Sequence, residues 1–128
     1  MAVSAMVDAV NRGDFAAALA AFTETPVIVE DIAPFRWQGA GAPSAWLAAM
    51  GANAARLEAR SIKMTLGQAT RIDVEAGSAY ALFPGGLSLA TAKGDLVSKG
   101  ILTLTLNEED GLWLIDTLVW SGPETAPR

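Results

Sequence analysis

The chain has 128 residues, of which 52% are hydrophobic and 18% are charged, so it is long enough for one folded domain and too apolar to be disordered. Nine Lys and Arg residues face 14 Asp and Glu residues, and the net charge of −5 argues against nucleic acids and anionic membranes as partners. The sequence contains no cysteine and no histidine, which excludes disulfides, thiolate or imidazole metal sites and a Ser-His-Asp triad. Any catalysis must therefore use carboxylate, Tyr, Lys or Arg side chains, and we expect neither a metal nor a cofactor.

The N-terminal residues do not resemble a targeting segment. Residues 1–10 contain no Lys or Arg and include Asp8, whereas a signal peptide begins with positive charge. The longest apolar run, Phe15 to Phe22, has eight residues, far fewer than the ~20 that cross a bilayer. We therefore expect a cytoplasmic protein that does not enter the membrane.

The first half of the chain is typical of helices. Apolar residues at helical spacing predict a helix over residues 2–12 and a second helix after Asp14, which ends at Thr25-Pro26 because proline disfavours helix at the residue before it. Residues 27–32 and 35–38 are predicted to form two short strands. Pro43 fits the first turn of a third helix, whose apolar face comprises Trp46, Leu47, Met50, Ala54 and Leu57.

The second half is typical of antiparallel strands. Turn sequences separate four predicted strands, over residues 61–73, 78–91, 96–106 and 112–121. Pro84-Gly85-Gly86 interrupts the second of these and predicts a bulge or bend. Residues 122–128 are predicted to be a flexible tail. Helices followed by a run of strands predict an α+β fold in a single domain, residues 1–128.

The last predicted strand has two largely apolar faces. Alternation places Leu114, Asp116, Leu118 and Trp120 on one face, and the other face carries Trp113, Ile115, Thr117 and Val119. The helices can cover one face, and the other then needs a partner. We therefore expect a homodimer that forms through the outer face of the sheet.

The order of these motifs resembles the NTF2-like superfamily, in particular its SnoaL-like and ketosteroid isomerase-like branch. The resemblance spans nearly the whole chain and is carried by Asn11-Arg12-Gly13-Asp14-Phe15, Phe22, Val27-Ile28-Val29-Glu30-Asp31, Trp37-Gln38-Gly39 and Gly111-Leu112-Trp113-Leu114-Ile115. It implies a cystatin-like cone, in which a curved, mixed or antiparallel sheet wraps around the N-terminal helices and encloses an apolar pocket. It also implies dimerisation through the outer sheet face, in agreement with the two-sided strand.

The resemblance places Asp31 at the position of the general base of ketosteroid isomerase. On strand alternation, Asp31 shares a face with Val27 and Val29, and Glu30 points the other way. An isolated carboxylate in an apolar pocket is suited to proton transfer, although Asp31 can equally cap the following turn. The two oxyanion donors of the isomerase fall on Met6 and near Leu102, so steroid isomerisation by the same arrangement is not expected.

Two other residues can complete such a site. Tyr80 shares a strand face with Leu82, and the resemblance places Asp116 and Trp120 at the cavity wall. Asp31 and Asp116 would then form a carboxylate pair with separate acid and base roles. The structural alternatives are a core aromatic at Tyr80 and a satisfied polar group at Asp116.

The sequence therefore supports two functions. In the first, Asp31, Tyr80 and Asp116 catalyse an isomerisation, dehydration or cyclisation without a cofactor, and the ligand contacts Met6, Val29, Leu82, Leu102 and Trp120. In the second, the same pocket binds an apolar or aromatic small molecule, or the chain binds a partner protein, without catalysis.

Overall fold

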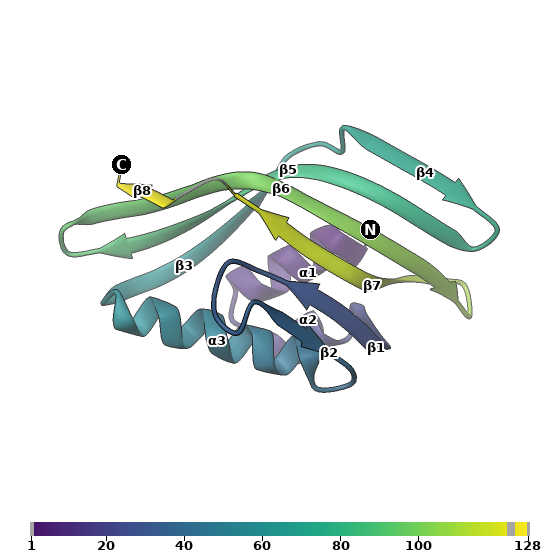
Figure 1. The fold of residues 1–128 in the computed structure, drawn as a ribbon, viewed down its shortest axis with the longest axis horizontal. Helices are drawn as coiled ribbons and strands as arrows, with labels where there is room; N and C mark the ends of the chain where they lie inside the picture. The colour runs from purple at the N-terminus through teal and green to yellow at the C-terminus, as the bar shows by residue number, and fades with distance from the viewer. Residues whose placement is uncertain (1, 123–124, 128) are drawn as a thin grey trace.

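A curved mixed sheet dominates the computed structural model, which describes residues 2–122 and 125–127 (Figure 1). The helices are α1 (Ala2–Asn11), α2 (Phe15–Leu19) and α3 (Ala42–Arg56). The strands are β1 (Phe22–Val29), β2 (Arg36–Gln38), β3 (Ala59–Leu66), β4 (Arg71–Glu75), β5 (Ser78–Thr91), β6 (Gly94–Glu109), β7 (Leu112–Ser121) and β8 (Thr125–Pro127). They form one sheet in the order β2-β1-β7-β6-β5-β3, in which β4 also pairs with β5 and β8 with β6. All the strand pairs are antiparallel except the parallel pair β1–β7. The α+β class and the curved mixed sheet predicted from the sequence are confirmed.

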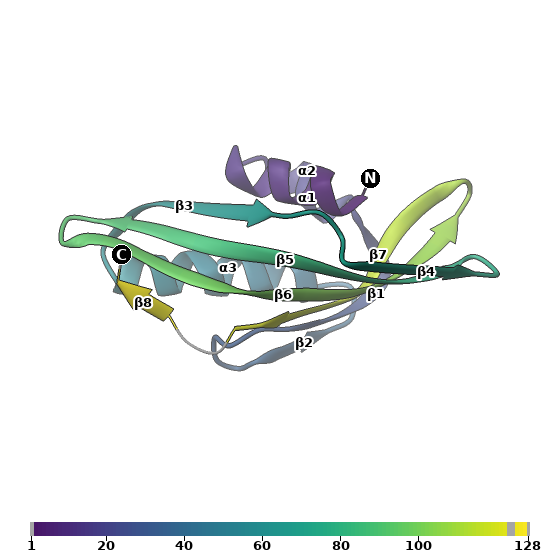
Figure 2. The same ribbon diagram turned by 90° about the horizontal axis from the view of Figure 1, so that it is seen from above.

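The three helices cover the concave face of the sheet. Figure 1 shows α3 running beneath the arch, and Figure 2 shows α1 and α2 beside β3. In α1 the buried Val3, Met6 and Val7 have the predicted helical spacing. The side chain of Asn11 extends the contact of α1 with β3, because its amide donates to the Met64 carbonyl at 2.8 Å and its oxygen accepts from the Met64 N–H at 2.7 Å.

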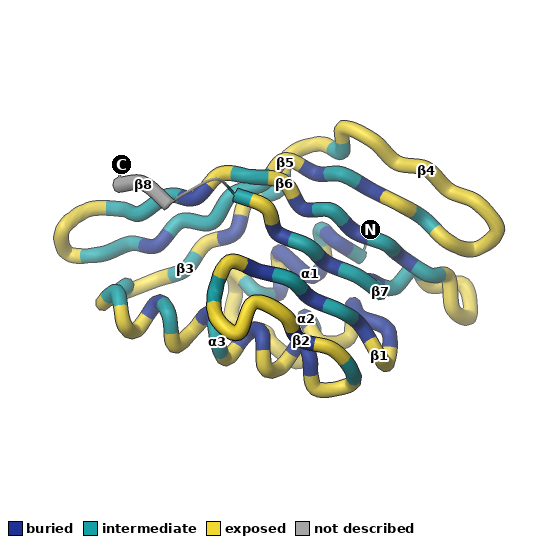
Figure 3. Tube along the Cα trace, in the orientation of Figure 1, coloured by how far each residue is buried: buried dark blue, intermediate teal, exposed yellow. Residues whose placement is uncertain are grey.

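The core consists of rows of side chains that cross the sheet on this concave face. Directly paired residues of neighbouring strands lie on the same side, so the register identifies each row. One buried row contains Ile28, Leu118, Leu104 and Ala81, and the next contains Trp120, Leu102 and Phe83. Figure 3 shows the buried positions concentrated where the helices meet β1, β7 and β6, whereas β4 is exposed. The opposite, convex face carries the row Val29, Val119, Thr103 and Leu82.

The second helix is shorter than predicted. It ends at Leu19, and β1 already begins at Phe22, so Thr25-Pro26 lies within a strand and does not end a helix. The register of β1 against β7 shifts between Phe22 and Val27, which accommodates a proline in an interior strand. Asp14 caps α2 as predicted, since its carboxylate accepts from the Ala17 N–H at 3.2 Å.

The strand predicted over residues 61–73 is two strands. The segment 67–70 leaves the sheet between β3 and β4, and both strands pair with β5. Pro84 lies at this gap, where its missing N–H costs no ladder bond, and its carbonyl accepts from the Gly67 N–H at 2.8 Å. The register of β5 against β6 continues through Pro84-Gly85-Gly86 without a shift, so the predicted bulge is absent from that pair.

The C-terminal residues are described in part. Residues 125–127 form β8 on β6, whereas 123–124 and 128, which belong to the predicted flexible tail, lie outside the described residues. Among the helices that the structure describes, none is long and apolar enough to cross a membrane.

Candidate active site between helix α3 and the sheet

A cavity of about 760 Å³ opens between α3, the loop after β1 and the concave face of the sheet. Its walls are mostly apolar, with Leu87, Leu89, Leu96 and Trp120 contributed by the sheet. The polar side chains around it are Asp31, Asn53, Arg56 and Ser98. An apolar cavity with few polar groups is the usual form of a small-molecule site.

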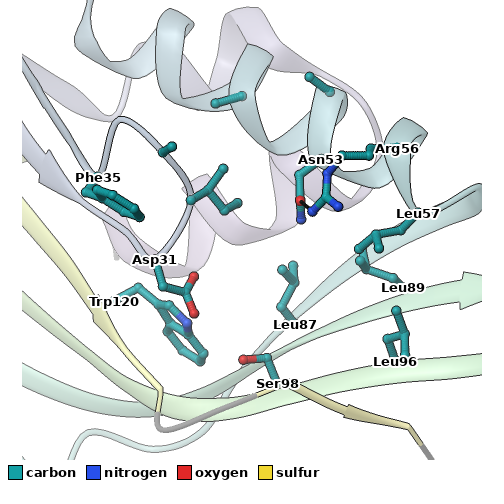
Figure 4. A pocket seen from close by; sticks show the side chains of 14 residues that line it. Asp31, Phe35, Asn53, Arg56, Leu57, Leu87, Leu89, Leu96, Ser98 and Trp120 are labelled. Atoms are coloured by element: carbon teal, nitrogen blue, oxygen red, sulfur yellow. Dashed lines mark hydrogen bonds between the residues drawn. The ribbon is translucent and has the colours of Figure 1, made fainter.

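Asp31 lies at the mouth of this cavity. Strand β1 ends at Val29, and the following loop turns the chain so that the Asp31 carboxylate points into the cavity beside the Trp120 indole (Figure 4). Asn53 and Arg56 lie across the cavity on α3, where the Arg56 guanidinium donates to Asn53 Oδ1 at 2.7 Å. The site therefore has a carboxylate on one side and a cation on the other.

Glu30 points into the interior. Its side chain is only 7% exposed, and Oε1 accepts a hydrogen bond from Trp46 Nε1 at 3.1 Å. It lines a recess of about 10 Å³, room for about one water, whose wall shares Leu87 and Trp120 with the cavity. Burial, aided by the neighbouring Asp31 carboxyl, raises the pKa of Glu30 to about 7. This carboxyl group can therefore gain or lose a proton near neutral pH.

Ser98 brings an unsatisfied hydroxyl to the cavity wall. Its side chain is 5% exposed, and among the described residues its Oγ has no hydrogen-bond partner. A methyl group added at Gly122 would lie 3.3 Å from Ser98 Oγ and 3.2 Å from Trp120 Nε1, so the Gly122 backbone lies over both polar atoms. A buried polar atom without a partner requires an explanation, and a bound ligand is one.

Structural comparison identifies the fold to which this site belongs. A candidate scytalone dehydratase from Novosphingobium aromaticivorans superposes with a TM-score of 0.81 at 15% identity, covering 99% of this chain and 83% of that one. A type 3 hexachlorocyclohexane dehydrochlorinase, LinA, from Novosphingobium barchaimii gives 0.79 at 12% identity, covering 99% and 85%. A candidate dehydratase of the NTF2-like family from Streptomyces avermitilis gives 0.77 at 14% identity, covering 96% and 91%. The chain has the NTF2-like fold.

This likeness is visible in structure alone. No protein-family model matches the sequence, and no curated protein matches it significantly. The expected superfamily fold is confirmed, but an NTF2-like fold supports many activities, so the function must be argued from the site.

The structure does not bring the three predicted catalytic residues together. Asp31 lines the cavity, whereas Tyr80 and Asp116 are not among its lining residues. Tyr80 pairs with Thr105 and Asp73 on the convex side, and the Arg71 guanidinium lies 5.3 Å from its ring centre. The strand face that carries Tyr80 is therefore not the concave one, where Ala81 and Phe83 are buried.

Asp116 has a structural partner. It occupies a bulge in β7, where Thr105 and Leu106 of β6 oppose Thr117 and Ile115, and its Oδ1 accepts from the buried Thr23 hydroxyl at 2.9 Å. The bulge reverses the strand alternation, so Ile115 is buried on the same face as Leu118 and Trp120. The continuous alternation predicted for this strand is therefore corrected at Asp116.

Two of the five predicted ligand-binding residues line the interior spaces. Trp120 lines both the cavity and the recess, and Leu102 lines the recess. Met6, on α1, is fully buried in the core, and Val29 and Leu82 lie on the convex face. Those three residues are therefore placed away from the cavity.

Glu30 and Ser98 lie at the site although the sequence did not predict them as site residues. Strand alternation correctly placed Glu30 on the face opposite Val27 and Val29. That face, which Glu30 shares with Ile28, is the concave one, whereas the sequence predicted that the face of Val29 lines the pocket. A charged residue that continues the buried register of Ile28 was the available signal. No signal in the sequence marked Ser98. Among the described residues, no cluster of three or more His, Cys, Asp or Glu side chains could hold a metal ion.

Proposed function

We propose that this protein binds an apolar small molecule in the cavity beside α3 and transfers a proton on it, with Asp31 as the general base. The observation that carries the proposal is the Asp31 carboxylate pointing into a largely apolar cavity next to Trp120. Asp31 is exposed, and from the edge of the cavity its carboxylate can reach a proton of a bound ligand. The reaction class is isomerisation, dehydration or another elimination, which the polar side chains around the cavity can support without a cofactor.

The other polar groups of the cavity suit an oxygen-containing ligand. The Ser98 hydroxyl and the Trp120 indole N–H are donors near one end, and Arg56 is a cation at the other. A ligand with an apolar body and a carbonyl or phenolic oxygen would give the Ser98 hydroxyl the partner that it lacks among the described residues. Neighbours named as dehydratases and a dehydrochlorinase support eliminations as the chemistry that this fold accommodates.

Nitrophenolate binding to the Asp31→Asn variant tests this proposal. A nitrophenolate anion mimics a developing enolate, and a carboxylate beside it repels it, so removing the charge should strengthen binding at least tenfold, about 1.4 kcal/mol. The dissociation constant is measured by the visible absorbance of the anion at about pH 8. The matched control is Asp110→Asn, which removes the same charge at the exposed turn between β6 and β7. Equal constants for the two variants would overturn the assignment of Asp31.

A non-catalytic binding protein is the second candidate function. The absence of Tyr80 and Asp116 from the cavity lining favours it, because neither can then assist Asp31 directly. In that case the cavity binds ligand and Asp31 serves as a polar anchor. The two functions differ in whether a bound ligand loses a carbon-bound proton.

We also propose that a second copy of the chain covers the convex face. The row Val29, Val119, Thr103 and Leu82 is uncharged, and Ile101 beside it is 47% exposed. Ile101→Arg should convert a dimer into a monomer, as measured by sedimentation equilibrium, because burying an unpaired guanidinium is costly. Leu112→Arg, at a 65% exposed residue near the far turn, is the control and should stay dimeric. A wild-type monomer at micromolar concentration would contradict this interface.

A further inference from the structure

Two charged side chains line the cavity, and they have opposite signs. Asp31 follows β1, and Arg56 lies in the last turn of α3, across the cavity from it (Figure 4). Apolar side chains, Leu57, Leu87 and Leu89 among them, make up most of the remaining wall. The cavity is therefore an apolar space with a negative charge on one side and a positive charge on the other.

The proposed function gives the charge of Arg56 no partner. Among the described residues, Arg56 makes no ion pair with a carboxylate. Its guanidinium instead donates to the neutral side-chain amide of Asn53, with 2.7 Å between Nη2 and Oδ1. A guanidinium carries several N–H donors in a fixed plane, so this one bond leaves others available to a ligand. The positive charge at this wall is thus free to attract an anion from the cavity.

The same hydrogen bond orients the Asn53 amide. The guanidinium occupies its oxygen, so the N–H₂ group is the part of the amide that remains for a ligand. Asn53 is half-buried and lines the cavity one turn before Arg56, on the same face of α3. The two side chains therefore offer hydrogen-bond donors in adjacent positions, and a carboxylate is a group that accepts hydrogen bonds without donating any.

The charge balance favours a carboxylate over a phosphate at this position. A planar carboxylate can accept two parallel hydrogen bonds from one guanidinium, which is a strong and geometrically specific pairing. A doubly charged phosphate would exceed the single positive charge that Arg56 supplies among the lining residues. The protein as a whole has a net charge of −5 and repels anions at long range, so an anionic ligand depends on this local cation.

We propose that Arg56 and Asn53 form a carboxylate-binding subsite, and that the ligand of this cavity is an apolar carboxylic acid. This inference rests on the proposed function for the place where the ligand binds. Asp31 repels a carboxylate, so the acid binds with its carboxylate at Arg56 and its apolar end toward Asp31 and Trp120. The subsite therefore selects the ligand and determines which end of it meets the base.

Binding of 2-naphthoate and of its neutral amide, 2-naphthamide, tests this subsite. The two molecules share one apolar ring system, so the ratio of their dissociation constants measures recognition of the charge. At about pH 8 and low salt, the wild type should bind 2-naphthoate about fivefold or more tightly than 2-naphthamide, because a paired guanidinium and carboxylate attract each other. Isothermal titration calorimetry measures both constants.

Variants of the two subsite residues should remove this preference. Arg56→Gln should weaken 2-naphthoate about fivefold or more and leave 2-naphthamide nearly unchanged. Asn53→Asp should have the same effect with the arginine in place, because the new carboxylate pairs with Arg56 and repels the ligand. The matched control is Arg60→Gln, which removes the same charge at an exposed residue of β3 outside the cavity and should bind as wild type. A role of Arg56 in stabilising the end of α3 would change the stability and leave the preference between the ligands intact.

The outcomes separate this inference from the proposed function. The indole N–H signal of Trp120 in a ¹H–¹⁵N spectrum reports whether either ligand enters the cavity. Equal constants for the two ligands, or equal losses in Arg56→Gln and Arg60→Gln, overturn the carboxylate subsite. If 2-naphthamide still shifts the Trp120 signal in that case, the cavity of the proposed function stands. A wild-type Trp120 signal that ignores both ligands overturns the subsite and the proposed function together.

Discussion

At the residue scale, the burial of Glu30 makes the stability of the protein depend on pH. Its pKa rises from 4.5 when exposed to about 7 in the fold. Between these values the folded state keeps a proton that the unfolded state has lost, so the free energy of unfolding falls as the pH rises through this window. Above about pH 7 both states are ionised and the loss is complete.

Glu30→Gln should remove this pH dependence. One pKa unit corresponds to about 1.4 kcal/mol. The free energy of unfolding of the variant, relative to that of the wild type, should therefore rise by up to about 3 kcal/mol between pH 4.5 and pH 8. Urea unfolding at a series of pH values measures the difference between the two proteins. Parallel stability curves for wild type and variant would show that Glu30 titrates normally in the fold.

Single residues also explain where the sequence predicted the site well and where it did not. The family resemblance carried by Val29-Glu30-Asp31 predicted Asp31 at the pocket. Asp31 lines the cavity because the loop after β1 turns the residue inward, whereas simple strand alternation would have put it on the convex face. The unsatisfied hydroxyl of Ser98 depends on the approach of Gly122 from a distant part of the chain. A sequence pattern does not carry such contacts.

At the scale of elements, local signals predicted helices and strands wherever one residue type dictated the backbone. Pro43 at the start of α3, and the β-branched and Leu-rich runs of β5 and β7, gave correct elements. The errors occurred where tertiary pairing overrides a local preference. Thr25-Pro26 reads as a helix end, but the register shift between β1 and β7 accepts the proline within a strand.

The bulge at Asp116 is the clearest element-scale example. Alternation across residues 112–121 predicted one continuous face that contained both Asp116 and Trp120. The bulge inserts Asp116 between two ladder positions, and the Thr23 hydroxyl satisfies its carboxylate. One extra residue exchanges the two faces beyond it, so Asp116 stabilises a strand junction and Trp120 reaches the cavity without it.

At the scale of the whole molecule, the shape of the sheet produces the site. The strands curve over α3 (Figure 1). The cavity lies between α3 and the part of the sheet that carries Leu87 and Leu89 of β5 and Leu96 and Ser98 of β6. The order of helices and strands along the sequence was sufficient to predict this architecture. The volume and polar lining of the cavity were not predictable, because they depend on side chains from α3, β5, β6 and β7 that are distant in sequence.

The most direct test of the account is whether a small apolar ketone or phenol binds beside Trp120. The chain has four tryptophans, and their indole N–H signals are resolved in a ¹H–¹⁵N spectrum of the labelled protein and assigned with single Trp→Phe variants. Titration with 2-tetralone should shift the Trp120 signal most, because Trp120 lines both the cavity and the recess, and should leave Trp113 in place. A Trp120 signal that stays unchanged at saturating ligand, or a larger shift at Trp113, would contradict a binding site between α3 and the sheet.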